Sequence, residues 1–536
     1  MLNSASFRQR SLMRRFLVLL ALLAPLAYSQ QFDLLILNGR VLDGAGNPWF
    51  RADVGVCGDE IVALGNLSRA SAERTVDAKG HVVSPGFIDT HNHSSRRILQ
   101  VPASENFVRQ GVTTVVEGND GGSPLPLEPF FEKVRAARPS INYASFIGHG
   151  SVRQEIIGAA DRKATDEELE QMRNLVRRGM AQGALGLSTG LFYVPGAFAS
   201  TEEVIELARV AAESGGIHIS HMREEASGLI DSVNETIRIG EEGGLPTQLT
   251  HHKAVGPPNW GKSAETLELV EQARERGVDV SVDQYPYTAS HTGSAAMFEK
   301  WVQADGREAM NQRLSDPKLR ARIIGEVAET LRVNRGGGDP KNVQFSNCDW
   351  DPSLNGKTLA DATRRAGREV TFETAAQTAV ELQLSGGCLT VYHAMNEEDV
   401  ERIMAYPGTM IASDGGVIPF GEGVPHPRYY GTFPRVLGRY VREKGVLGLP
   451  DAVRKMTSLP SQRVGFFDRG LIRRGMKADI VIFDPDTIID RAQFGDSHKY
   501  AEGVSYVIVN GEVVLDDGEM SDARPGRILR GPAYTD

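Results

Sequence analysis

The stretch that decides the fold reads Pro85-Gly86-Phe87-Ile88-Asp89-Thr90-His91-Asn92-His93, a short apolar run that ends in two histidines separated by one residue. Alternate side chains of a β-strand lie on one face, so His91 and His93 can point into one site with about 7 Å between their Cα atoms. Neutral imidazole is the commonest metal ligand, and two imidazoles supply half of a tetrahedral zinc shell. A surface turn that happens to contain two histidines is the alternative, so the pair alone does not establish a metal site.

A regular alternation of strands and helices follows this stretch. Apolar runs typical of β-strands recur eight times, and amphipathic segments with a helical period separate most of them. Alternating βα units of this number predict an α/β fold, a parallel (β/α)8 TIM barrel. The runs lie at 87–88, 113–116, 141–147, 184–187, 217–220, 247–250, 278–282 and 410–412, with helices predicted at 202–214, 232–242 and 264–276.

The two ends of the chain resemble each other and differ from the middle. Short β-type runs occupy residues 31–84 and return at 470–536, and each set contains an Asn-Gly pair, Asn38-Gly39 and Asn510-Gly511, that is typical of a hairpin turn. We predict one small β-sandwich domain built from both termini. The barrel then covers 85–469, with an insertion of about 290–405 before its last strand. A chain of 536 residues is long enough for more than one folding unit.

Residues 1–30 have the pattern of a signal peptide. Basic residues from Arg8 to Arg15 precede an apolar run that is too short to span a bilayer, and the small residues of Ala27-Tyr28-Ser29 follow. We therefore expect an exported protein, periplasmic or secreted, with no stable membrane association after cleavage; an uncleaved anchor is the alternative. Cleavage would remove four arginines and no acid, which takes the net charge from −10 to −14 and argues against a nucleic-acid partner. Three cysteines, Cys57, Cys348 and Cys388, are too few for a disulfide framework, and we expect them to be structural.

Residues that can bind a metal follow several of the predicted strands. The active site of such a barrel lies at the carboxyl ends of the strands, so side chains that follow different strands meet there. Each of these residues alone has an ordinary structural explanation, whereas five strands that end in such residues predict a metal site. The candidates are His91 and His93 after the first strand, Glu117 and Asp120 after the second, His221 after the fifth, His251 after the sixth and Asp414 after the eighth.

Several of these motifs resemble one protein family. The segments GFIDTHNHS, ISHMREE around His221, LTHHK and NWGKS around and after His251, and MIASDG around Asp414 are similar to the amidohydrolase superfamily. Together with HPRYYGTFPRVLG and the segment from TSLPSQRVGFFDRG to ADIVIFDP, they resemble its D-aminoacylase, or N-acyl-D-amino-acid deacylase, branch over residues 32 to about 535. The resemblance implies a hydrolase that cleaves the linear amide bond of N-acyl-D-amino acids, small-molecule substrates, to a carboxylate and a free D-amino acid.

The resemblance also implies the metal ligands and the cofactor. His91, His93, His221, His251 and Asp414 match the family's positions, for one or two Zn²⁺ ions. Where the family typically has a cysteine, in a GNCG context, this chain has Gly118-Asn119-Asp120-Gly121, and we take Asp120 as the substitute, with Glu117 as the competitor. An oxygen ligand is harder than sulfur and weakens the preference for zinc. The resemblance further implies that the paired histidines hold the weaker metal, whereas Asp120, His221 and His251 hold the tighter one.

A reaction scheme follows from these residues. A metal ion lowers the pKa of water toward about 7 and polarises the amide carbonyl. Asp414 is the expected general base and then general acid; a helix-capping role is the alternative. For the substrate carboxylate the resemblance supports Tyr193, Lys253, Tyr285 and Arg428, with solvated or packing roles as the alternative, and His291 stands where the family often has serine near the substrate.

Two other functions fit parts of the pattern. One is a dipeptidase or cyclic-amide hydrolase of the same superfamily. The other is a non-catalytic binding protein on a decayed enzyme scaffold, which the complete ligand set disfavours. The fourth strand ends in Leu187-Ser188-Thr189-Gly190 and has no lysine, which disfavours the carbamylated-lysine bridge of hydantoinase-like relatives.

Overall fold

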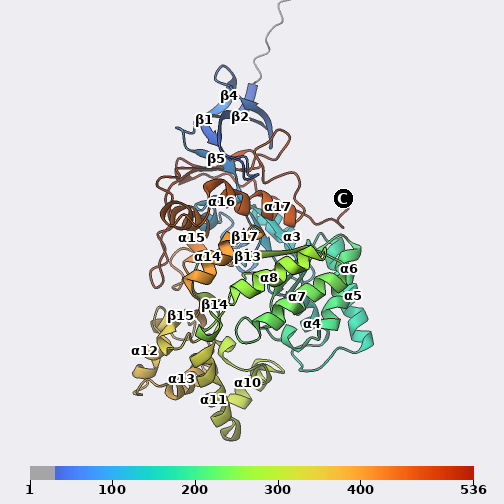
Figure 1. The fold of residues 1–536 in the computed structure, drawn as a ribbon, viewed down its shortest axis with the longest axis vertical. Helices are drawn as coiled ribbons and strands as arrows, with labels where there is room; N and C mark the ends of the chain where they lie inside the picture. Colours follow the sequence, from blue (N-terminus) through green and yellow to red (C-terminus); the bar gives the residue numbers. More distant parts are fainter. Residues whose placement is uncertain (1–30, 536) are drawn as a thin grey trace, which may run out of the picture.

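The computed structural model describes residues 31–535, and the predicted signal peptide at 1–30 lies outside them. The described chain forms three parts along its long axis (Figure 1). A β-domain from both ends of the chain lies at the top of the view, the barrel lies in the middle, and the insertion lies at the bottom. The α/β fold class predicted from the sequence is confirmed.

The barrel consists of parallel strands wrapped by helices. A six-stranded sheet in the order β17-β13-β12-β11-β10-β9 lies beside a three-stranded sheet, β6-β7-β8, and β8 and β9 follow each other with one residue between them. The bridge between Asn92 and Gly415 joins the first and last strands and closes the barrel. The strands are β6 (Phe87–Asp89), β7 (Val112–Glu117), β8 (Asn142–Ser145), β9 (Ile147–Gly148), β10 (Gly186–Gly190), β11 (Ile217–His221), β12 (Thr247–Leu249), β13 (Val280–Gln284) and β17 (Thr409–Ile411).

Helices cover the outside of the barrel and bury one apolar face each against it. In α6, for example, Val204, Leu207, Ala208 and Ala211 are buried, which is the helical spacing of an amphipathic surface helix. The three helices predicted from the sequence appear as α6 (Thr201–Glu213), α7 (Leu229–Gly243) and α8 (Ser263–Glu275). The others are α2 (Glu105–Val108), α3 (Glu128–Ala137), α4 (His149–Ile156), α5 (Asp166–Ala181), α14 (Glu397–Ala405), α15 (Arg428–Arg435), α16 (Leu449–Met456) and α17 (Ser458–Arg463).

The β-domain is a nine-stranded sheet in which β5 lies between β1 and β18, so that segments from the two ends of the chain pair directly. Its two Asn-Gly pairs differ. Asn510-Gly511 makes the predicted tight turn, with both φ angles positive. The turn predicted at Asn38-Gly39 is wrong, because β1 continues through it with a shift in register. The strands are β1 (Gln31–Val41), β2 (Phe50–Cys57), β3 (Glu60–Gly65), β4 (Ser71–Asp77), β5 (Val82–Pro85), β18 (Ile480–Phe483), β19 (Val504–Val509), β20 (Glu512–Asp516) and β21 (Glu519–Met520).

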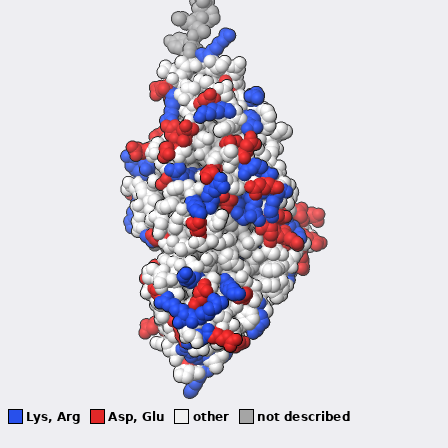
Figure 2. Space-filling model, turned by 90° about the vertical axis from the view of Figure 1, so that its left-hand side faces the viewer, with Lys and Arg blue, Asp and Glu red and all other residues white. Residues whose placement is uncertain are grey.

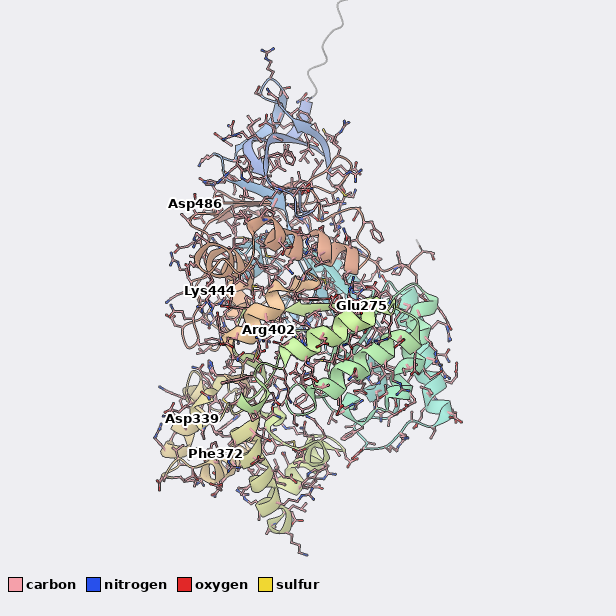
Figure 3. All side chains as sticks on the ribbon, viewed as in Figure 1. Glu275, Asp339, Phe372, Arg402, Lys444 and Asp486 are labelled. Atoms are coloured by element: carbon pink, nitrogen blue, oxygen red, sulfur yellow. A yellow bond between two sulfur atoms is a disulfide. The ribbon has the colours of Figure 1, made fainter. Side chains whose placement is uncertain are left out.

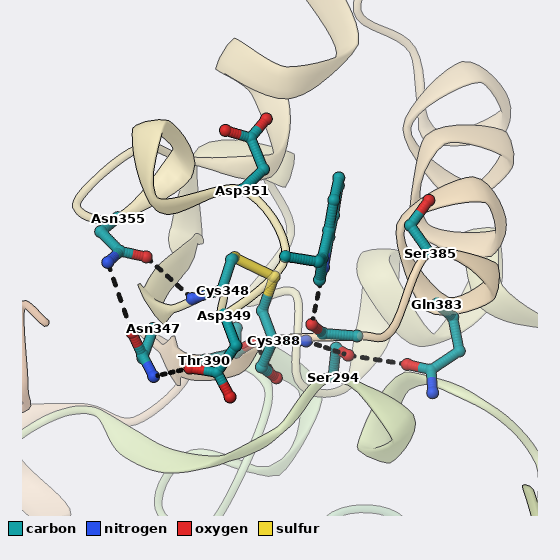
Figure 4. The surroundings of a disulfide bond; sticks show 12 residues. Ser294, Asn347, Cys348, Asp349, Asp351, Asn355, Gln383, Ser385, Cys388 and Thr390 are labelled. Atoms are coloured by element: carbon teal, nitrogen blue, oxygen red, sulfur yellow. Dashed lines mark hydrogen bonds between the residues drawn. A yellow bond between two sulfur atoms is a disulfide. The ribbon is translucent and has the colours of Figure 1, made fainter.

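The insertion has its own antiparallel sheet, β14-β16-β15, and its own buried apolar core. A disulfide joins Cys348 and Cys388, with 4.5 Å between their Cα atoms (Figure 4). The Ser294 hydroxyl accepts from the Cys388 amide and thereby fixes the start of β16. The elements are β14 (Ser290–Gly293), α9 (Lys300–Gln303), α10 (Arg307–Ser315), α11 (Pro317–Val333), β15 (Val343–Asn347), α12 (Leu359–Arg365), α13 (Phe372–Leu384) and β16 (Leu389–Tyr392).

The surface carries both signs of charge. Figure 2 shows Lys and Arg interspersed with Asp and Glu over the face in view. The labelled side chains of Figure 3 illustrate the same mixture, with Asp339 on the insertion, Arg402 on α14 and Lys444 directly after the π-helix Val436–Glu443. Within residues 31–535, no helix is both long enough and apolar enough to cross a bilayer.

Candidate metal centre

Four side chains from three barrel strands form one cluster. His91 and His93 follow β6, Asp120 follows β7, and Asp414 follows β17. The Asp414 Oδ1 atom lies 3.1 Å from His93 Nε2 and 3.7 Å from His91 Nε2. Asp120 Oδ1 lies 3.2 Å from His91 Nε2. The Asp414 amide donates to the His91 carbonyl over 2.8 Å, so closure of the barrel itself brings the first and last strands together here.

Asp120 also belongs to a second cluster with His221 and His251. Its Oδ1 atom lies 3.6 Å from His221 Nδ1 and 3.3 Å from His251 Nε2, and these two nitrogens are 2.6 Å apart. One carboxylate oxygen thus faces both clusters, which is the position of a bridging ligand. Asp120 adopts a left-handed backbone conformation with φ of 55°, a conformation that aspartate tolerates better than most residues.

The donor atoms fit a metal ion. Among the described residues, His91 Nε2 and Asp120 Oδ1 are buried and have no hydrogen-bond partner. Buried polar atoms without partners are costly, so two such atoms that face each other fit a cation bound between them. The imidazole nitrogens of the four histidines and the carboxylate oxygens are donors that zinc accepts.

Burial and neighbouring charges have opposite effects on the pKa values of the two carboxylates in the clusters. Burial raises the pKa of Asp120, but favourable interactions of the carboxylate with His91, His221 and His251 outweigh burial and hold that pKa well below its usual range. Burial also raises the pKa of Asp414, and Arg428 and His91 lower it more. Both carboxylates are therefore ionised at neutral pH. Burial lowers the pKa of His221 to about 4, which keeps this imidazole neutral and able to bind a metal.

Glu117, the competing candidate, lies outside both clusters. It is buried beside a cavity that His93, Asp120 and Asp414 also line, and burial raises its pKa to about 7. Its Oε1 atom has no hydrogen-bond partner among the described residues. Asp120, and not Glu117, is the carboxylate that faces the histidines, although its role as a ligand stays a prediction.

Sequence reasoning missed Glu225, which lies behind the histidines. Its Oε1 atom accepts from the Lys253 ammonium and lies 3.3 Å from His251 Nδ1, and its Oε2 atom lies 3.8 Å from His221 Nε2 and 3.3 Å from Arg335 Nη2. Burial raises the pKa of Glu225, but Lys253 and His221 outweigh it and leave the pKa well below its usual range. Such carboxylates orient metal-binding imidazoles. The signal in the sequence was its position four residues after His221.

The predicted substrate-binding residues fall into two groups. Tyr193, His291 and Arg428 line one cavity together with His93, Asp120 and Asp414. Arg428 is buried, and its Nη1 atom lies 2.8 Å from Asp414 Oδ2.

Lys253 and Tyr285 are not among the described residues that line this cavity. Lys253 is buried against Glu225 and donates to the His251 carbonyl over 2.7 Å. Tyr285 lies beneath Arg428, with 4.8 Å between the guanidinium carbon and the ring centre. A direct contact of these two residues with substrate stays a prediction.

The cavity itself has a volume of about 970 Å³ and opens at the carboxyl ends of the barrel strands. Ligand sites commonly measure roughly 300–1,000 Å³, so this one lies near the upper end of that range. It is large enough for an amino acid that carries a substituent. The arrangement can therefore hold a carboxylate-bearing amide beside a metal centre and an ionised aspartate.

The similarity to known proteins agrees with this geometry. Residues 74–515 match the model of the Amidohydrolase family. The chain is 39% identical over 524 residues to the D-aminoacylase of Alcaligenes xylosoxydans xylosoxydans, which covers 94% of this chain and 98% of that protein. It is 37% identical to the N-acyl-D-glutamate deacylase of the same organism, again over 94% and 98%.

Solved structures give the same result. A crystal structure of D-aminoacylase superposes with a TM-score of 0.80 at 36% identity, covering 93% of this chain and all of that one. The N-acyl-D-glutamate deacylase of Bordetella bronchiseptica, solved with zinc and a phosphonate inhibitor, superposes with a TM-score of 0.80 at 35% identity. The match covers 94% of this chain and all of that one. A further D-aminoacylase structure describes a binuclear metal centre. This chain therefore belongs to the amidohydrolase family, in its D-aminoacylase and N-acyl-D-amino-acid deacylase branch, and is a metal-dependent hydrolase of linear amide carbon–nitrogen bonds.

Proposed function

We propose that this protein is an exported deacylase that hydrolyses N-acyl-D-amino acids to a carboxylate and a free D-amino acid, with zinc held by His91, His93, Asp120, His221, His251 and Asp414. One observation carries the proposal: two buried clusters of ligand atoms share Asp120 and open into a cavity that also contains a buried arginine. The sequence similarity to D-aminoacylase and N-acyl-D-glutamate deacylase supports the substrate class.

Asp414 is proposed to move the proton. Its two oxygens have different partners, since Oδ2 is held by Arg428 and Oδ1 faces the histidines. Because the lowered pKa keeps the carboxylate ionised, Oδ1 can accept a proton from the attacking water and pass it to the leaving nitrogen. Arg428 fixes the direction of that transfer.

Arg428 is also proposed to bind the substrate carboxylate, because its guanidinium has five donors and can serve Asp414 and a second carboxylate together. Tyr193 adds a hydroxyl in the same cavity. Bound zinc supplies Lewis acidity that polarises the amide carbonyl. The chain's residues hold the amide against that centre and carry the proton.

Export is supported by two independent features. Residues 1–30 have the charge and apolar pattern of a signal peptide. The disulfide between Cys348 and Cys388 also supports export, because disulfides persist in oxidising compartments and are rare in the cytosol. A free cytosolic pool of the mature chain with both cysteines reduced would contradict export.

The test of the activity is a panel of N-acetyl D- and L-amino acids, dipeptides and cyclic amides, assayed together with metal content. We expect release of D-amino acids and no turnover of cyclic amides. Asp414→Asn retains the metal and loses activity by about 10²–10⁴-fold, the usual contribution of a general base. Turnover of dipeptides or cyclic amides alone would replace the deacylase assignment with the alternative function.

A further inference from the structure

The cavity over the metal centre has two chemically different walls. One wall is cationic and polar, with Arg96, His291, Arg428 and Tyr429. Arg428 Nη2 donates to the His291 carbonyl over 3.3 Å, and the ring centres of His291 and Tyr429 lie 5.8 Å apart, so these three residues share one side of the cavity. The proposed function uses this wall for the substrate carboxylate.

The other wall is apolar and has no assigned role. It is formed by Pro124 and Leu125 from the loop after β7, by Phe130 on α3, and by Val194 and Pro195 from the loop after β10. Leu125, Phe130 and Val194 are half-buried, and Pro195 is buried. We call these five residues the apolar lobe. Gln154 and the exposed Glu155 lie at its rim.

The loops that carry the apolar lobe are fixed in place. The Ser123 hydroxyl accepts from the Gly148 amide over 2.9 Å, and the Ser151 hydroxyl donates to the Ser123 carbonyl over 2.9 Å. The loops after β7 and β10 also touch, because a Cβ atom added to Gly121 would lie 2.8 Å from the Gly190 nitrogen. The lobe is therefore a preformed surface, which lowers the entropic cost of binding a flexible ligand.

The order of groups along the substrate decides what reaches the lobe. An N-acyl amino acid has its carboxylate on one side of the amide and its acyl chain on the other. A substrate with its carboxylate at Arg428 and its amide carbonyl beside Asp120 and His93 would direct its acyl chain away from the cationic wall. That direction leads toward the cavity residues of the loops after β7 and β10.

We propose that the apolar lobe binds the acyl chain, and that the preferred substrates carry an uncharged aliphatic acyl group of several carbons instead of acetyl. This inference rests on the proposed function and specifies its substrate. The apolar side chains gain by covering a hydrocarbon chain, at about 0.8 kcal/mol for each buried methylene, which corresponds to about fourfold. The carboxylate of Glu155 at the rim disfavours a dicarboxylic acyl group.

The experiment measures kcat/KM of the zinc-loaded full chain on acetyl, butanoyl, hexanoyl and octanoyl derivatives of a panel of D-amino acids. We expect a rise of about two- to fourfold for each added methylene up to hexanoyl, because the half-buried lobe covers the chain incompletely. A flat or falling series with measurable acetyl turnover overturns the acyl-chain proposal and leaves the deacylase function intact. No hydrolysis at any acyl length overturns both.

Substitutions that keep the side-chain volume test whether the apolar lobe causes the preference for longer acyl groups. Leu125→Asn and Val194→Thr change side-chain polarity with little change in volume, and each is expected to lower the hexanoyl-to-acetyl ratio by about threefold or more. Leu389→Asn is the matched control, because Leu389 lines the same cavity from β16, outside the lobe. Its ratio should equal that of the wild type, and an equal fall in Leu389→Asn would overturn the assignment of the lobe.

A second substrate series separates the acyl chain from the amino-acid side chain. N-acetyl derivatives of D-alanine, D-norvaline and D-norleucine lengthen the side chain at constant acyl group. We expect Leu125→Asn to leave the length dependence of this series unchanged. If Leu125→Asn alters this series and spares the acyl series, the lobe binds the side chain and the proposal is wrong.

Discussion

Substitution of Glu225 by Gln tests the idea that a single buried carboxylate organises the metal-binding histidines. The substitution keeps the shape of the side chain and removes its charge. Glu225 is 1% exposed and serves two cations, Lys253 and Arg335, as well as the imidazoles of His221 and His251. Removing one partner of a buried ion pair costs about 3–5 kcal/mol of folding free energy, because the remaining charge stays buried.

The same change should weaken metal binding. Carboxylates that orient metal-binding histidines typically account for about 10–100-fold in affinity. We therefore expect Glu225→Gln to lower the free energy of unfolding of the metal-free protein in urea by about 3–5 kcal/mol. We expect zinc affinity, measured by competition with a chelator, to fall by about 10–100-fold.

Glu203 provides the control. It is 5% exposed, accepts from Arg153, lies 3.0 Å from His149 Nε2 and belongs to neither metal cluster. Glu203→Gln should destabilise the fold by a similar amount and leave zinc affinity unchanged. Wild-type zinc affinity in Glu225→Gln, or an equal loss of affinity in both variants, would refute the reasoning.

Three further predictions concern single histidine and aspartate side chains. His221→Ala should remove more bound metal than His91→Ala in an elemental analysis after dialysis, since His221 belongs to the tighter site that the family resemblance implies; equal losses would contradict this ranking. Asp120→Cys should raise the ratio of bound zinc to bound manganese in a competition experiment, because thiolate is the softer ligand; an unchanged ratio would count against Asp120 as a ligand. Burial lowers the pKa of His218 to about 3 from 6.5, so the unfolded chain takes up a proton at a higher pH than the folded protein does. The free energy of unfolding therefore falls by about 1.4 kcal/mol per pH unit as the pH falls below 6.5. His218→Gln should reduce this pH dependence, measured by urea unfolding between about pH 6 and pH 4. An equal pH dependence in the variant and the wild type would disprove the prediction.

The metal clusters could be predicted because their ligands follow five different strands of the barrel. The rule that strand ends of a parallel barrel meet at one face converts positions far apart in sequence into neighbours. His91 and Asp414, which are 323 positions apart, were paired in this way. Asp120 followed from the same rule with help from the family motif, and the structure brings it to both clusters.

Contacts made by the insertion could not be predicted, because no periodic rule relates its residues to the barrel. Arg335 reaches Glu225 across 110 residues, and Cys348 reaches Cys388 across 40. We expected the cysteines to be structural, and the sequence did not indicate that two of them pair. Cys57 has no disulfide partner among the described residues.

The two Asn-Gly pairs show the limit of a local signal. Asn510-Gly511 ends its strand, because β20 returns directly along β19. At Asn38 the amide donates to Asp53 Oδ1 over 3.0 Å, and β2 pairs with β1 on both sides of the left-handed residue. Pairing with β2 thus keeps β1 continuous and produces a bulge at Asn38-Gly39 where a hairpin turn was predicted. This pairing is a tertiary effect that the dipeptide sequence does not encode.

The closure of the barrel between Asn92 and Gly415 fixes the order in which the protein can be assembled during synthesis. Half of the first cluster is made within the first hundred residues, but Asp414 joins it only after three-quarters of the chain has left the ribosome. Pairing of such distant segments is slow, because the intervening chain must be ordered first. The complete centre therefore arises late, and a chain truncated before Gly415 would retain several histidines but would lack the closed ring that orients them.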